Sequence, residues 1–181
     1  MRPTETLMHE HKIILMVLDA AEQEVRRMRE TGTVRTERLE QMVDFFRNFA
    51  DRCHHAKEEK LLFVRMEERG MSREAGPIGV MLYEHDIGRG HVRAIAELLP
   101  QVANNPAAQR EIQQHLEDYI QLLRDHIYKE DNILYPMADQ LLSPEDQEAL
   151  GEAFERVERE EIGEGVHERY VELAHVLAGG G

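Results

Sequence analysis

The chain has 181 residues, a single cysteine and a formal net charge of −14, which argues against nucleic acid or an anionic membrane as a partner. No apolar run approaches the ~20 residues of a membrane-spanning helix, and the first residues lack the apolar stretch of a secretory signal. The lone Cys53 excludes an intrachain disulfide, so we expect a cytoplasmic protein.

The chain shows helical periodicity without strand-like alternation, which predicts an all-α fold. Long amphipathic helices are expected over residues 4–30, 36–70, 77–100 and 104–142. The sequence SPED at 143–146 has an N-cap serine followed by proline and begins a fifth, shorter helix. Because short connections join the long helices, we predict an up-down-up-down four-helix bundle over residues 1–142. Residues 143–181 are expected to form a C-terminal helical extension packed on or near it.

The first and third helices each place one histidine inside an apolar stripe. At about 100° per residue, His11 lies in the stripe of the first helix and His9 points away. The third helix has His85 in its stripe, and His91 points away. The apolar residues of these stripes are Leu7, Met8, Ile14, Leu15 and Leu18 in the first helix, and Ile78, Met81, Leu82, Val92 and Leu99 in the third.

The second helix contains HHAKEEKLLF, residues 54–63, in which two histidines precede two glutamates by four residues. On a helical projection at about 100° per residue, His54 and Glu58 lie at the edge of the apolar stripe, one turn apart. His55 and Glu59 lie on the far side. We therefore predict one inward pair and one solvent-facing pair. The stripe itself is Leu39, Met42, Phe46, Phe49, Ala50, Cys53 and Leu61.

The fourth helix repeats the inward pair, because His126 and Glu130 both fall within its stripe and lie one turn apart. The two residues can therefore meet the same ion. The stripe consists of Ile112, Leu116, Leu123, Ile127, Leu134, Met137 and Leu141.

The inward histidines and glutamates are expected at one level of the bundle, since their distances from the helix ends agree to within a few turns at ~1.5 Å per residue. A single core histidine is ordinarily a hydrogen-bonded structural residue. Two buried carboxylates, however, require cations. Among basic residues, only Arg89 is predicted on these inner faces. The pattern therefore favours a metal centre over a structural role.

The donor set of nitrogen and carboxylate oxygen suits iron, manganese or zinc, and argues against copper(I) or an iron–sulfur cluster. The donors are too many for one tetrahedral zinc and suit two ions joined by carboxylates. Ferritin-like carboxylate proteins use Glu-x-x-His, whereas this chain has His-x-x-x-Glu twice on its long helices.

Four motifs together resemble the hemerythrin-like, HHE cation-binding family across residues 4–142. They are EHKII at 10–14, HHAKEEKLLF at 54–63, GPIGVMLYEHDIGRG at 76–90 and HIYKEDNILYPMA at 126–138. The resemblance implies a four-helix bundle that holds two iron ions joined by carboxylates and an oxo or hydroxo group. It implies Glu58 and Glu130 as bridging ligands, and His11, His54, His85 and His126 as terminal ligands.

The family's sites contain a fifth histidine, so the resemblance implies one ligand more than those assigned. Tyr119, which faces inward two turns before His126, and His167 in the extension are further candidates. Asp131 is the alternative to Glu130 as the fourth-helix carboxylate. Arg89 stands where hemerythrins have a second histidine on the third helix, and it is expected to bind an anion or to neutralise a core carboxylate.

These features favour a protein that binds or reacts with dioxygen, peroxide or nitric oxide, either as a redox enzyme or as a binding protein. One alternative is an iron donor or repair factor for damaged iron–sulfur clusters, because the third and fourth motifs resemble those of cluster-repair proteins. Another is a metal-dependent sensor. No catalytic group is predicted beyond the metal ligands, and the protein is expected to be a monomer or a homodimer.

Overall fold

A computed structural model describes residues 1–179, and within that range every regular element is a helix. The all-α prediction is therefore confirmed, and the predicted helices are found with ends shifted by only a few residues. Four helices, α2, α4, α5 and α7, continue into π-helical or 3₁₀ segments, which are numbered η1 to η5. The elements are α1 (Pro3–Thr31), α2 (Thr36–Phe45), η1 (Phe46–His55), η2 (Glu58–Leu62), α3 (Phe63–Glu68), α4 (Pro77–Leu98), η3 (Leu99–Gln101), α5 (Pro106–Lys129), η4 (Glu130–Leu134), α6 (Tyr135–Leu141), α7 (Pro144–Val157), η5 (Glu158–Gly163) and α8 (Val166–Gly179).

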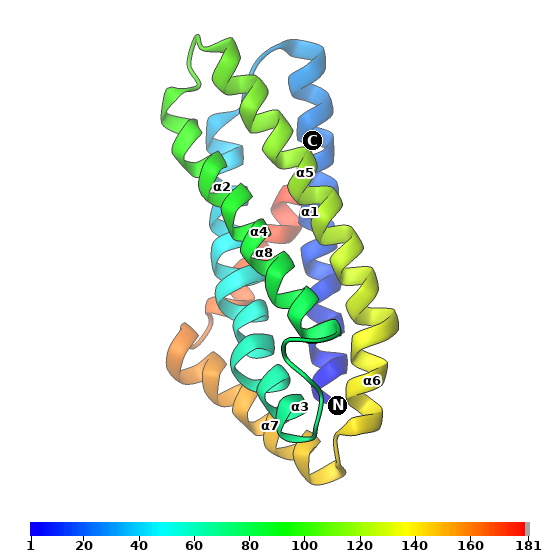
Figure 1. Ribbon diagram of the computed structural model, residues 1–181. Coiled ribbons are helices and arrows are strands. Elements are labelled where there is room, and N and C mark those ends of the chain that lie inside the picture. The colour runs from blue at the N-terminus through cyan, green and yellow to red at the C-terminus, as the bar shows by residue number, and fades with distance from the viewer. Residues whose placement is uncertain (180–181) are drawn as a thin grey trace.

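Long helical rods run lengthwise beside one another (Figure 1). They are α1, the continuous run from α2 to α3, α4, and the continuous run from α5 to α6. α5 contacts both α1 and α4, and α4 contacts α2 and η1. This arrangement is compatible with the predicted four-helix bundle. No helix among the described residues is both long and apolar enough to cross a membrane.

The helix ends follow local sequence signals. α1 ends before Gly32, whose φ of 68° is the left-handed conformation that glycine adopts without strain. α5 begins after Asn105, whose side chain accepts a hydrogen bond from the amide of Ala108. α7 begins with a capping box, in which Ser143 and Asp146 each accept a hydrogen bond from the other's backbone amide.

The extension formed by α7, η5 and α8 packs along the bundle. α7 contacts α1 and η2 near one end, and α8 runs back against α1 and α2 (Figure 1, orange and red). Polar contacts accompany this packing. The Tyr170 hydroxyl donates to Asp44 at 2.9 Å, and the guanidinium of Arg38 donates to the carbonyl of Leu177.

The apolar core is divided into two parts along the bundle. One part contains Phe45, Phe46 and Phe49 with apolar residues of α1, α4, α5 and α8. The other contains Leu62, Phe63 and Leu134 with apolar residues of α1, α4, α6 and α7. In three rods the predicted ligand residues fall between these two sets in the sequence, and in the fourth Glu130 does so while His126 precedes the last residue of the first set, Ile127. A buried polar layer therefore separates two apolar layers.

Three π-helical segments flank this polar layer, namely η1, η2 and η4. A π-turn accommodates one more residue than an α-turn, so it rotates the following residues away from a regular helical projection. The effect is visible in the core. Met137, predicted in the buried stripe, is 37% exposed, while Tyr135 and Ala138 are buried in its place. Leu62 rather than Leu61 is likewise the fully buried leucine after η2.

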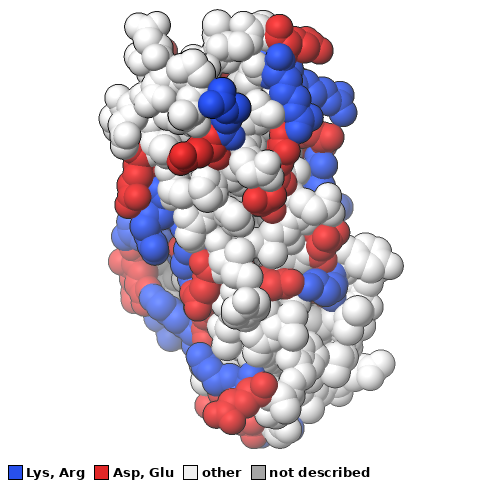
Figure 2. Space-filling model, turned by 45° about the horizontal axis from the view of Figure 1, so that its top comes forward, with Lys and Arg blue, Asp and Glu red and all other residues white. Residues whose placement is uncertain are grey.

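The surface mixes charges of both signs. Figure 2 shows basic side chains mostly beside acidic ones. Arg124, for example, reaches Asp19 and Glu22 across the α1–α5 contact at 2.7 and 2.6 Å. Each exposed ion pair of this kind contributes little to the stability of the fold.

Candidate metal centre

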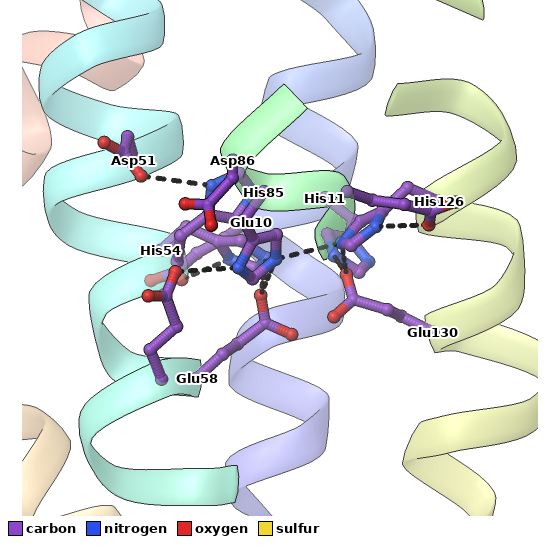
Figure 3. Close-up of polar contacts among 12 residues, drawn as sticks. Glu10, His11, Asp51, His54, Glu58, His85, Asp86, His126 and Glu130 are labelled. Atoms are coloured by element: carbon purple, nitrogen blue, oxygen red, sulfur yellow. Dashed lines mark hydrogen bonds and ion pairs between the residues drawn. The ribbon is translucent and has the colours of Figure 1, made fainter. Parts of the chain in front are cut away.

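Five histidines and two glutamates converge at the polar layer (Figure 3). None of these residues is more than 5% exposed. All four rods contribute, so the layer depends on the packing of the whole bundle. The residues are His11 from α1, His54 and His55 from η1, Glu58 from η2, His85 from α4, His126 from α5 and Glu130 from η4.

The donor atoms form two compact groups. The three-histidine group consists of His55, Glu58, His85 and His126, and the two-histidine group consists of His11, His54 and Glu130. Within each group the candidate ligand atoms all lie within 4.8 Å of one another. Each group is therefore small enough to surround one metal ion.

The glutamates lie between the two groups. Glu58 Oε1 is 3.4 Å from His54 Nε2 in one group and 3.5 Å from His85 Nε2 in the other. Glu130 Oε1 is 3.3 Å from His11 Nε2 and 3.1 Å from His126 Nε2. Each carboxylate is thus placed to share its oxygens between the two groups.

Several of these buried atoms have no hydrogen-bond partner in the protein. They are His54 Nε2, Glu58 Oε1 and both carboxylate oxygens of Glu130. Leaving such atoms buried and unpaired is costly, most of all for charged oxygens. Cations that accept electron pairs from these atoms would remove the cost. The donor set therefore fits metal ions.

The outer nitrogen of every histidine is held by a carboxylate. When Nδ1 is bound in this way, Nε2 is directed to the centre in a fixed orientation. Figure 3 shows several of these contacts. The pairs are His11 with Asp131 at 2.7 Å, His54 with Glu10 at 2.9 Å, His55 with Asp51 at 3.3 Å, His85 with Glu59 at 2.8 Å and His126 with Glu84 at 3.0 Å.

Two of these outer carboxylates are in turn fixed by one cation. The Arg89 guanidinium donates to both Asp51 and Glu59, so a single side chain orients the partners of His55 and His85. Burial alone would raise the pKa of Asp51, but the hydrogen bonds from His55 and Arg89 lower it to about 2. Arg89 was expected to bind an anion or to neutralise a core carboxylate. It instead neutralises the outer carboxylates that hold His55 and His85.

A buried lysine connects the centre to the C-terminal extension. Lys57 Nζ lies 2.6 Å from Glu10, which holds His54, and also donates to Glu158 of η5. Burial alone would lower the pKa of Lys57, but Glu10 and Glu158 raise it, so the ammonium stays charged. Glu158 also binds His167 Nδ1 at 2.9 Å. The extension is thus joined to a candidate ligand through ionic contacts.

The direction of the pKa shift differs between the residues of the layer. Burial tends to lower the pKa of His126, but Glu130 and Glu84 raise it to about 10. Burial lowers the pKa of His54 to about 4, which favours the neutral imidazole that a metal requires. Burial together with the charge of Glu130 raises the pKa of Glu58 to about 8. Metal ions would favour the charged form of both glutamates.

Sequence reasoning missed a tyrosine in the layer. The Tyr135 hydroxyl donates to Glu58 Oε2 at 2.9 Å and lies 3.4 Å from His11 Nε2. Its ring stacks on that of His11 with centroids 5.4 Å apart. Tyr135 directly follows η4, so a regular helical projection misplaces it.

The prediction that His55 faces solvent is wrong. It is 5% exposed, and its ring stacks on that of His85 with centroids 3.8 Å apart. The π-helical geometry of η1 turns both members of the histidine doublet inward. Glu59 is also not a free surface residue, because it holds His85 Nδ1.

The other candidates lie at the margins of the layer. Asp131 binds the outer nitrogen of His11. Tyr119 packs its ring on Phe46 with centroids 4.8 Å apart and lines a cavity of about 180 Å³ beside His55 and His85. His167 lies on the far side of Glu10, 3.9 Å from its carboxylate. The structure thus brings the six assigned ligands together with His55, rather than with His167.

Comparisons with known proteins give matches over most of the chain. Residues 2–138 match the hemerythrin HHE cation binding domain. The uncharacterized protein Rv1995 of Mycobacterium tuberculosis is 24% identical over 161 residues, which are 88% of this chain and 62% of that protein. The iron-sulfur cluster repair protein YtfE of Musicola paradisiaca is 36% identical over 89 residues, and that of Salmonella schwarzengrund 37% over 89; each match covers 47% of this chain. The chain thus spans under two thirds of Rv1995 and 40% of either repair protein. Because the match covers most of the chain, the protein belongs to the hemerythrin HHE cation-binding family.

Proposed function

We propose that the protein holds two iron ions in an up-down-up-down four-helix bundle and binds or reacts there with a small oxidant: dioxygen, peroxide or nitric oxide. The observation that carries this proposal is the position of Glu58 and Glu130 between two groups of histidine nitrogens. Carboxylates so placed can bridge a pair of ions. A single ion would leave one histidine group without a cation.

The donor chemistry supports iron. Imidazole nitrogen and carboxylate oxygen suit iron, and neither group contains a thiolate. His55, His85 and His126 would hold one ion and His11 and His54 the other, with both glutamates shared. The two-histidine group supplies fewer protein donors, so the ion there would have a free coordination position for an exogenous ligand.

A bound iron pair supplies redox chemistry at an open coordination position. The chain's own residues shape that position. The apolar layers on either side exclude bulk water from it. The Tyr135 hydroxyl lies beside the two-histidine group, and burial keeps its pKa well above the usual value, so it remains a hydrogen-bond donor.

We expect protein produced with ample iron to contain close to two irons per chain. The reason is that each donor group surrounds one ion and each bridging carboxylate serves both. Metal analysis combined with the near-ultraviolet spectrum of the air-exposed protein measures this, because an oxo-bridged ferric pair absorbs there and zinc does not. A reproducible content of one metal per chain would contradict the iron pair.

A second candidate function is iron donation to damaged iron–sulfur clusters. It is favoured by the similarity to proteins named as iron–sulfur cluster repair proteins. An iron donor should lose iron to an apo iron–sulfur acceptor at comparable concentration, and cluster formation on the acceptor can be followed optically. A protein that handles oxidants should instead retain its iron through repeated additions of peroxide. Sustained peroxide consumption without transfer would eliminate the donor function.

A metal-dependent sensor is a third candidate. It is favoured by the contact of Lys57 with both Glu10 and Glu158, since this contact couples the extension to His54. The coupling must act in both directions: if docking of the extension strengthens metal binding, bound metal strengthens docking by the same factor. Amide exchange in α8, compared between the loaded and metal-free protein, tests this function.

A further inference from the structure

Two histidines outside the metal centre face each other across the contact between α4 and α5. Nδ1 of His91 lies 3.0 Å from Nδ1 of His115, and the ring centroids are 5.3 Å apart. Both side chains are half-buried. A hydrogen bond between two such nitrogens requires one of them to carry no proton, so at least one imidazole lone pair is available.

We propose that His91 and His115 bind a divalent transition-metal ion of the zinc class, outside the main centre. Two histidine nitrogens on one tetrahedral zinc lie ~3.3 Å apart, given Zn–N bonds of about 2.0–2.1 Å. The observed separation of 3.0 Å is close to that value. Small ring movements convert the hydrogen bond into a chelate once the donor ring changes tautomer, with its Nδ1 proton released to water and Nε2 protonated instead.

The surroundings of the pair favour a metal over protons. Burial and the neighbouring His115 lower the pKa of His91, which keeps its imidazole neutral, as a ligand must be. The negative charge of Asp118 acts on His91 in the opposite sense, and it would attract a cation. Asp118 follows His115 by three residues on α5 and accepts a hydrogen bond from the Gln114 amide at 2.9 Å, so it would serve as a third donor only after a change of rotamer. Water would complete the shell.

The pair is separate from the main centre. His91 follows His85 by six residues, which is ~9 Å along a helix at about 1.5 Å per residue. An ion at the pair would join α4 to α5, the helices that supply His85 and His126. With two or three protein donors rather than four, the ion would exchange more readily than a structural zinc.

Another group of potential ligands is less suited to an ion. Glu10, Cys53, Glu158 and His167 also have donor atoms within 4.8 Å of one another. The ammonium of Lys57, however, already lies between the two carboxylates. Burial also raises the pKa of the Cys53 thiol, which disfavours the thiolate that a metal requires. The His91–His115 pair has no such resident cation.

The test uses iron-loaded protein, so that the main centre is filled, and titrates it with zinc chloride by calorimetry. The parent should bind one zinc per chain beyond its iron. His91→Ala and His115→Ala should each bind it at least 10-fold more weakly. His175→Ala, which removes an exposed histidine of α8, should bind it like the parent. Zinc should also raise the melting temperature of the parent and not that of the double variant His91→Ala/His115→Ala, because only the parent binds the ion in its folded state.

Iron content and helical circular dichroism of each variant are measured alongside, so that a folding defect is recognised. Absence of a zinc site in the parent would overturn the proposal. So would unchanged zinc binding by His91→Ala, or zinc uptake matched by an equal loss of iron, which would place the zinc at the main centre.

Discussion

His55→Ala is expected to lose metal as severely as His54→Ala. His55 belongs to the three-histidine group, and Asp51 holds its outer nitrogen. Alanine would leave the ion there with two histidines and the shared carboxylates. Even the loss of a residue that only orients a ligand costs about 10–100-fold in metal affinity. Loss of the ligand itself should cost at least that much, as measured by competition with a coloured chelator.

The exposed His9 supplies the matched control, since His9→Ala removes a histidine from the same part of the bundle without touching the layer. It should retain metal like the parent. Should His55→Ala also retain both ions while His54→Ala loses one, His55 would be a structural residue that only stacks on His85. The layer would then contain four histidine ligands.

The histidine doublet shows where prediction from the sequence ends. The helices, their ends and the inward direction of His11, His85 and His126 follow from a regular projection, because α1, α4 and α5 are regular helices up to these residues. His54 was predicted only at the edge of its apolar stripe, and it lies in η1. The projection fails at His55 because η1 is π-helical. It fails again beyond η4, where Tyr135 replaces Met137 in the buried face. Nothing in a periodicity of 3.6 residues reveals a π-turn, and such turns occur frequently at functional sites.

The long-range contacts could not be predicted for a different reason. Glu10 and Lys57 read as ordinary charged residues of amphipathic helices, yet both are at most 3% exposed. Their burial depends on η5 and α8 covering this side of the bundle, with Glu158 as the second partner of Lys57. The sequence predicted the extension but not the face against which it packs. The ionic contacts that orient His54 therefore became visible only in the folded chain.

Lys57→Met is expected to destabilise the protein strongly and to weaken metal binding. Methionine fills a similar volume, so the main change is the loss of a buried cation between Glu10 and Glu158. Removing one member of a buried ion pair typically costs about 3–5 kcal/mol, because the partner charge stays buried. We therefore expect the free energy of unfolding in urea to fall by about that amount. Metal affinity should fall about 10–100-fold, since Glu10 then orients His54 less firmly.

Lys60→Met supplies the matched control three residues away. Lys60 is 69% exposed and lies 4.0 Å from Glu161, so its loss should change stability by no more than about 0.5 kcal/mol. The double variant Lys57→Met/Glu158→Gln removes one of the stranded charges and should recover part of the stability lost in Lys57→Met. If it recovers stability without recovering metal affinity, Lys57 acts on the metal through Glu10 alone. Equal behaviour of Lys57→Met and Lys60→Met would show that the extension is not coupled to the centre through this lysine.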